Sequence, residues 1–164
     1  MALRNVVTEG DDILRKTCRE IPEVTDRIRQ TLADMLETMR AENGVGIAAP
    51  QIGIMRRMFV AEPEEGRTYY MINPVMLSQE GEVAADEGCL SVPGYIGTVV
   101  RPEKITIEAT DLDGQRQTYT FEGFDARVMC HEYDHLEGIL YVDKATNVRL
   151  AANDQEEDEE ETGA

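Results

Sequence analysis

Tryptophan is absent from this 164-residue chain, histidine occurs twice and cysteine three times. No run approaches the roughly eighteen apolar residues of a membrane-spanning helix, and the N-terminal MALRNVVTEGDD lacks the apolar core of a secretory signal. Cys18, Cys89 and Cys130 are odd in number and widely spaced, which argues against a disulfide framework. We therefore expect no membrane partner and a cytoplasmic location.

Basic residues are also scarce, since 16 Lys and Arg face 33 Asp and Glu, giving a net charge of −17. Nucleic-acid phosphates would repel such a chain, so we expect no direct nucleic-acid binding. The last fourteen residues, AANDQEEDEEETGA, hold seven acids and no base, which leaves −10 on residues 1–150. We expect a single catalytic domain over 1–148 and a disordered acidic tail over 149–164, favoured as a solubilising end rather than a docking segment.

The order of predicted elements indicates an α+β fold. Residues 25–44 show helical apolar periodicity, with Thr25 or Asp26 as a possible cap and Asn43-Gly44 as a stop. A shorter helix is predicted over 11–18. Two β-rich runs, 57–61 and 68–73, flank a charged turn, and residues 103–123 alternate on both sides of Asp113-Gly114 as in a hairpin.

Both histidines lie in CHEYDHLEG, residues 130–138. Apolar spacing predicts a helix there, with Asp125 as its cap and Gly138 as its stop. His131 and His135 would then share one face, one turn apart, where two imidazoles can bind one metal ion. Glu132 would point about 100° around the helix, within reach of a water on that metal. This is the H-E-x-x-H arrangement of two ligands and a general base.

A metal site of this kind needs a third protein ligand, and no third histidine exists. Cys130 would face about 100° away from His131 and is interpreted as a small buried hydrophobe, while Cys18 is interpreted as structural. Cys89 lies between glycines in DEGCLSVPG and could present a thiolate from an exposed turn. Glu137 and Asp143 are the alternative ligands.

A third segment, GVGIAAPQ (44–51), would taken alone be a buried strand followed by a turn at Pro50. Together, GVGIAAPQ, EGCLS (87–91) and HEYDH (131–135) resemble the three signature motifs of peptide deformylases in content, order and separation. The resemblance extends over about residues 5–145. It implies antiparallel sheets packed around a central metal-binding helix in a single α+β domain. It also implies a hydrolase that removes the N-terminal formyl group of nascent polypeptides and releases formate.

The resemblance assigns Cys89, His131 and His135 as metal ligands and Glu132 as the catalytic acid/base. One thiolate with two imidazoles suits zinc or iron(II). The resemblance implies one divalent metal per chain, natively Fe²⁺, with Zn²⁺, Ni²⁺ or Co²⁺ as substitutes. A metal of this kind makes hydroxide accessible at neutral pH, and a carboxylate can pass the proton to the leaving amine.

The resemblance also assigns Gln51 and the backbone N–H of Leu90 to the formyl oxygen, where such donors stabilise a developing oxyanion. Val45 and Gly46 correspond to backbone that pairs with the substrate peptide as an added strand. This mode of binding recognises the main chain of the peptide, so it tolerates many side-chain sequences. The expected partners are therefore formylated nascent N-termini, and any ribosome contact is not assigned to the acidic tail.

Two positions depart from the family pattern: Cys130 replaces a frequent glutamine, and Asp12 stands where proline is expected. Three other functions remain as alternatives. A zinc-dependent peptidase would share H-E-x-x-H without needing Cys89. A catalytically silent peptide-binding relative would not need Glu132. An acidic interaction protein would act through its tail alone.

Overall fold

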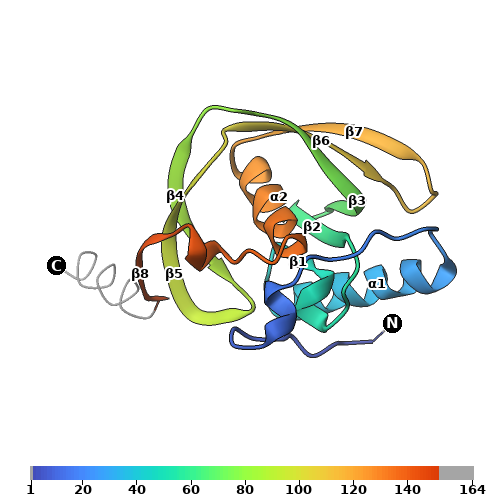
Figure 1. Cartoon of the computed structure of the whole chain (residues 1–164), viewed down its shortest axis with the longest axis horizontal. Helices are drawn as coiled ribbons and strands as arrows, with labels where there is room; N and C mark the ends of the chain where they lie inside the picture. Colours follow the sequence, from blue (N-terminus) through green and yellow to red (C-terminus); the bar gives the residue numbers. More distant parts are fainter. Residues whose placement is uncertain (1, 152–164) are drawn as a thin grey trace.

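The computed structural model describes residues 2–151, with two α-helices, eight strands and three short 3₁₀ helices in that part of the chain. Figure 1 shows helix α2 in the middle of the molecule, between two groups of strands. The elements, in chain order, are η1 (Asp12–Arg15), α1 (Asp26–Ala41), β1 (Gly46–Ala48), η2 (Ala49–Ile52), β2 (Met58–Glu64), β3 (Arg67–Glu80), β4 (Val83–Cys89), β5 (Val92–Arg101), β6 (Lys104–Thr110), β7 (Arg116–Glu122), α2 (Gly123–Leu136), η3 (Tyr141–Asp143) and β8 (Thr146–Leu150).

Helix α1 forms where its periodicity predicts it. Thr25 caps it, since its hydroxyl accepts a hydrogen bond from the Ile28 N–H at 3.2 Å. Leu32, Met35 and Met39 are fully buried beneath it, against β1 and β2. The apolar face therefore fixes α1 on the sheet and leaves its C-terminal end beside the strand that follows.

Helix α2 is confirmed, but its predicted cap is wrong. The N-cap is Glu122, without a side-chain cap hydrogen bond, and Asp125 instead forms an ion pair with Arg67. The reason is that β7 runs directly into the helix through Gly123, whose φ of 62° turns the chain and whose N–H bonds to the Glu103 carbonyl at 2.8 Å. The direct connection from β7, and not a capping side chain, thus sets the start of the helix.

The predicted helix over 11–18 is also shorter than expected, because only Asp12–Arg15 forms a 3₁₀ turn. Asp11 caps this turn by accepting from the Ile13 N–H. The chain then extends, because the Cys18 N–H bonds to the carbonyl of Leu136 at 2.8 Å. This tertiary hydrogen bond fixes the N-terminal segment against the end of α2 and prevents continued helix.

Two antiparallel sheets flank α2. One has five strands in the order β1-β2-β3-β6-β7, and the other has three in the order β4-β5-β8. The predicted hairpin is confirmed as β6–β7, with Lys104 opposite Glu122 and Thr110 opposite Arg116. Among the described strands, β1 pairs only with β2, and no described strand covers its outer edge. The antiparallel sheets around a central helix confirm the expected α+β architecture.

Strand β8 carries the described fold two residues beyond residue 148. Leu150 pairs with Tyr95, and Arg149 pairs with Ile96, because the strand runs antiparallel along β5. The expected disordered tail lies outside the described residues from position 152 onward, and its order stays a prediction. Within residues 2–151, neither helix combines the length and apolar character needed to cross a membrane.

Candidate metal centre and active site

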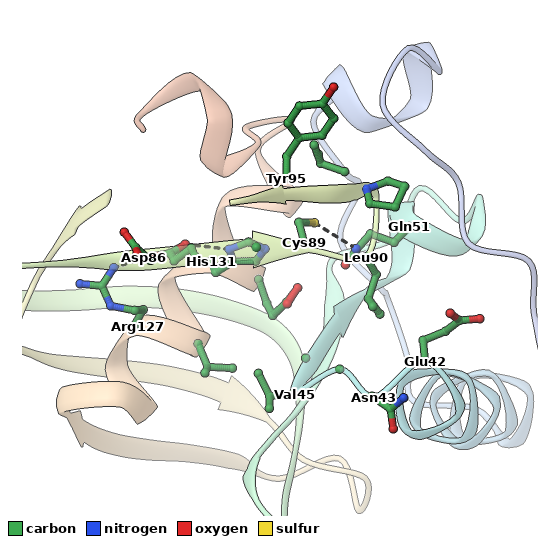
Figure 2. Close-up of a pocket in the computed structure, with 18 of the residues that line it drawn as sticks. Glu42, Asn43, Val45, Gln51, Asp86, Cys89, Leu90, Tyr95, Arg127 and His131 are labelled. Carbon is green, nitrogen blue, oxygen red and sulfur yellow. Dashed lines mark hydrogen bonds and ion pairs between the residues drawn. The ribbon is translucent and has the colours of Figure 1, made fainter. Parts of the chain in front are cut away.

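A cavity of about 550 Å³ opens where three segments meet α2. Its walls come from the end of α1 with β1, from the turn between β4 and β5, and from the face of α2 that carries Arg127 and His131 (Figure 2). The lining includes every sequence-predicted site residue except His135, which lies one turn deeper on the same helix. Segments separated by about forty residues therefore converge on one site.

Cys89, His131 and His135 bring one possible ligand atom each to within 4.8 Å of one another. The Cys89 Sγ lies 3.4 Å from His135 Nε2, and Cys89 ends β4 opposite Val92 across a tight turn. Among residues 2–151 this is the one group of three such residues with that geometry. A thiolate and two imidazoles form a donor set suited to zinc or iron(II), so the residues fit a divalent metal.

The alternative third ligands lie elsewhere. Glu137 forms an ion pair with Arg57, and Asp143 forms one with Arg15. Cys130 is 6% exposed, and burial raises the pKa of its thiol to about 11, which matches the interpretation of a small buried hydrophobe. The geometry therefore leaves Cys89 as the third member.

Glu132 is enclosed beside this group. Its side chain is buried, and burial raises the pKa of its carboxyl to about 7. Oε1 has no hydrogen-bond partner among residues 2–151 and lies 4.0 Å from His135 Nε2. A buried carboxylate oxygen rarely stays without a partner, so this atom is placed to bind a group that enters the site.

Strand β1 limits the space on the other side of Glu132. A methyl group added at Gly46 would lie 2.7 Å from Glu132 Oε2 and 2.9 Å from Cδ and Cγ. Glycine is therefore required for the strand to pass this close to the carboxylate. This constraint links the GVGIAAPQ segment directly to the H-E-x-x-H helix.

Sequence reasoning missed Glu87, which orients His131. Its Oε1 accepts from His131 Nδ1 at 2.8 Å, a bond visible in Figure 2 that leaves Nε2 as the free ligand atom. Arg101 binds Glu87 through two hydrogen bonds of 2.9 Å, and Arg127 adds one of 2.6 Å. Burial opposes ionisation, but the hydrogen bonds from His131 and Arg101 outweigh it and hold the pKa of Glu87 well below its usual value.

This network continues to the far side of α2. Arg101 is 3% exposed and also donates to Asp134 at 2.6 Å, while Lys144 reaches the same carboxylate at 3.0 Å. No local sequence signal identifies these partners, since Arg101 lies on β5 and Asp134 on α2. The only available hint was Glu87 itself, a charged residue two positions before the candidate thiol ligand.

The Gln51 side chain lies beside Cys89, and a hydrogen bond to the nearby backbone fixes its orientation. Its Oε1 accepts from the Ala48 N–H at 2.8 Å, which orients Nε2 toward Ser91 Oγ at 3.1 Å and Cys89 Sγ at 3.5 Å. Figure 2 shows Gln51 and Leu90 on the same side of Cys89. Ser91, fully buried, is a second residue that sequence reasoning missed.

Val45 and Gly46 line the cavity on the side of β1. The Val45 side chain is 41% exposed, and its carbonyl accepts from the Glu62 N–H at 2.7 Å. Because hydrogen bonding alternates along an antiparallel strand, the N–H and C=O of Gly46 point to the open edge of β1. An extended peptide could pair with this edge.

The family model described as polypeptide deformylase matches residues 3–151. The peptide deformylase of Symbiobacterium thermophilum is 45% identical over 98% of this chain and 75% of its own length. That of Agathobacter rectalis is 49% identical over 88% of this chain and 90% of its own. The crystal structure of the Thermotoga maritima peptide deformylase superposes with a TM-score of 0.85 at 34% identity, covering 88% of this chain and 98% of that one.

Proposed function

The chain belongs to the polypeptide deformylase family, and from that premise we propose how its site removes the formyl group from the N-terminus of nascent polypeptides. The observation that carries the proposal is the convergence of Cys89, His131 and His135 beside the buried carboxylate of Glu132. Two ligands on one helix turn and a third on a strand end form a site that can hold a metal with an open position.

The family is metal-dependent, and Cys89 Sγ, His131 Nε2 and His135 Nε2 would hold the ion. The proposed native ion is Fe²⁺, with Zn²⁺, Ni²⁺ or Co²⁺ as substitutes, because one thiolate and two imidazoles suit each of these metals. The bound ion would supply Lewis acidity, which makes a water molecule a competent nucleophile near neutral pH.

Glu132 is the proposed acid/base. It takes a proton from the attacking water and returns it to the peptide nitrogen as the bond to the formyl carbon breaks. The products are formate and a free amine, so the proton that Glu132 accepts is the one it gives back. Burial favours this role, because a carboxyl with a pKa of about 7 can both accept and donate a proton near neutrality.

The Nε2 amide of Gln51 and the backbone N–H of Leu90 are the proposed donors to the formyl oxygen as it gains negative charge. The bond from the Ala48 N–H to Gln51 Oε1 supports this assignment, since it fixes which end of the amide faces the site. Losing one such donor typically costs about 10²–10³ in kcat.

The substrate peptide is proposed to add to the open edge of β1 at Val45 and Gly46. Main-chain pairing of this kind is tolerant of side-chain sequence. The open edge of β1 at Gly46 among the described strands and the close approach of β1 to Glu132 support this placement, since both bring the formyl amide of the substrate to the carboxylate. We propose a cytoplasmic enzyme that acts on formylated nascent N-termini, and we assign no ribosome contact to the acidic tail, because ribosomal RNA would repel it.

The test is formate release from formyl-Met-Ala-Ser by anaerobically purified protein, with metal content measured on the same sample. Formate release with about one metal per chain is expected. Fully metallated protein that releases no formate would favour the silent peptide-binding relative.

Two variants separate the remaining alternatives. Glu132→Gln should abolish activity with metal retained, because it removes the proton carrier and leaves the ligands. Cys89→Ala should lose the metal, whereas a peptidase with a different third ligand would keep it. Cys130→Ala is the matched control for the thiol, and it should retain both metal and activity.

A further inference from the structure

Ser91 is a polar residue beside the metal centre to which the proposed reaction gives no role. Its side chain is fully buried, and a hydroxyl in such a place is costly unless it is hydrogen-bonded. The Ser91 Oγ accepts from Gln51 Nε2 at 3.1 Å, and the same nitrogen lies 3.5 Å from Cys89 Sγ (Figure 2). The Gln51 amide nitrogen therefore lies between the Ser91 hydroxyl and a proposed metal ligand.

The Ser91 hydroxyl controls the direction of this amide. Both hydrogens of a carboxamide lie on one planar nitrogen, so a hydrogen bond from one of them fixes the direction of the other. With one hydrogen on Ser91 Oγ, the other is directed toward Cys89, on the side where the formyl oxygen is proposed to bind. The terminal torsion of a glutamine side chain has only broad preferences of its own, so hydrogen bonds decide its orientation. The Ala48 N–H, which donates to Gln51 Oε1 at 2.8 Å, is the second anchor.

The main chain keeps Ser91 and Gln51 at a fixed separation. The Val7 N–H donates to the Gln51 carbonyl, and the Glu9 N–H donates to the Ser91 carbonyl, both at 2.7 Å. Two residues of one segment thus bind both partners, which closes a ring with the side-chain bond. Ser91 and Gln51 therefore cannot separate without breaking one of these three hydrogen bonds.

We propose that Ser91 is a positioning residue, whose hydroxyl directs the Gln51 amide toward the formyl oxygen of the substrate. The proposal rests on the proposed function. Ser91 acts through the amide and not on the substrate itself. A donor that is already directed before the reaction needs no reorganisation when negative charge develops on the oxygen, which is the condition for strong stabilisation of a transition state.

The effect of Ser91 is expected in the transition state. The formyl oxygen gains its charge only there, so a misdirected donor lowers kcat and kcat/KM equally and leaves KM unchanged. Complete loss of one such donor typically costs about 10²–10³ in kcat. Ser91→Ala keeps the Gln51 amide and its bond from the Ala48 N–H. We therefore expect a smaller loss, about tenfold in kcat, because misplacement by about 1 Å costs about 10²-fold.

The experiment is a double-mutant cycle with Ser91→Ala, Gln51→Ala and both changes together. Formate release from formyl-Met-Ala-Ser, metal content and urea unfolding are measured on each preparation. Ser91→Ala should lower kcat about tenfold with KM and metal content unchanged. In the Gln51→Ala background the same change should cost less than about twofold in kcat, because no amide remains to be directed.

Thr38→Val is the matched control for the loss of a buried hydroxyl. Thr38 is 2% exposed, and its hydroxyl also accepts an N–H, that of Arg4 at 2.9 Å. It lies on α1 and does not line the cavity. Thr38→Val should lower the urea midpoint of unfolding, as Ser91→Ala should, but keep kcat within about twofold of the original chain. The pair of variants thus separates positioning from a general loss of stability.

A spectroscopic measurement tests the bond in the unaltered chain. In zinc-loaded protein labelled with ¹⁵N at glutamine, relaxation of the Gln51 side-chain nitrogen should show a rigid amide, in contrast to the exposed Gln115 and Gln117. The Gln51 signal is identified by its loss in Gln51→Ala. In Ser91→Ala the same amide should become more mobile.

Four results would overturn the proposal. The first is a loss of kcat in Ser91→Ala no greater than in Thr38→Val. The second is a tenfold loss that persists in the Gln51→Ala background, which would assign the hydroxyl to another contact. The third is an increased KM with unchanged kcat. The fourth is a Gln51 amide as mobile as the exposed ones in the unaltered chain, which decides the question even if Ser91→Ala does not fold. An unaltered, metallated chain that releases no formate would instead overturn the proposed function, which is a distinguishable result.

Discussion

Gly46→Ala is the sharpest perturbation that this structure offers, because it tests the position of Glu132 without changing any reacting group. The added methyl would lie 2.7 Å from Oε2 and 2.9 Å from Cδ of Glu132. Ordinary contacts of this kind are about 3.5 Å, so strand and carboxylate must separate by several tenths of an ångström or the side chain must rotate. Glu132 is 3% exposed, which leaves it little room.

The expected effects differ in size for stability and catalysis. Overpacking a buried site costs about 1–3 kcal/mol in free energy of unfolding. Misplacing a catalytic group by about 1 Å costs about 10²-fold in rate. Gly46→Ala should therefore reduce kcat by about a hundredfold, with metal content unchanged and the protein still folded at 25 °C. Steady-state formate release, metal analysis and urea titration on one preparation measure all three.

A double variant identifies the cause. Glu132→Ala removes all three atoms that the added methyl would meet, so Gly46→Ala should cost much less free energy of unfolding in the Glu132→Ala background than in the original chain. If the two losses instead add, the methyl acts through some other contact. Full activity of Gly46→Ala alone would refute the reasoning, because it would mean that the position of Glu132 in the structure is not the one used in catalysis.

Three further outcomes follow from buried charges and thiols. Glu87→Gln removes the buried carboxylate that Arg101 and Arg127 share, and only Arg101 keeps a second one, Asp134. Urea titration should therefore show a loss of about 3–5 kcal/mol, and a loss below about 1 kcal/mol would contradict the network. Hydrogen bonds from Ala2, Gln30 and Arg4 outweigh burial and hold the pKa of Asp34 below its usual value. The ionised Asp34 carboxylate therefore stabilises the fold above the unfolded pKa of about 3.9, and this stabilisation is lost as pH falls through the folded pKa. Asp34→Asn should lower the free energy of unfolding at pH 7, and the difference from the original chain should disappear in acid. Burial raises the thiol pKa of Cys18 and Cys130 to about 11, so mass spectrometry after iodoacetamide at pH 8 should find both unmodified in the folded, metal-free protein.

Features that depend on neighbouring residues were predictable from the sequence. Helix α1 with its Thr25 cap and the β6–β7 hairpin arise from periodicity, capping and turn chemistry within about twenty residues. The pairing of His131 with His135 on one face is fixed by helix geometry alone. Predictions from local sequence were wrong where a contact with another segment sets the structure. The connection from β7 sets the start of α2 without Asp125 as a cap. The hydrogen bond from the Cys18 N–H to the Leu136 carbonyl ends the predicted 11–18 helix early.

The sequence by itself determined the two histidines of the candidate metal site and the acidity of the chain, since residue types and helix spacing need no tertiary contact. Only the tertiary structure decided that Cys89, and not Glu137 or Asp143, stands beside the histidines, because that depends on how β4 packs against α2. It likewise decided that Glu87 orients His131, and that β8 pairs with β5. These contacts join residues dozens of positions apart, and the packing of distant strands and helices, which no local pattern encodes, sets them.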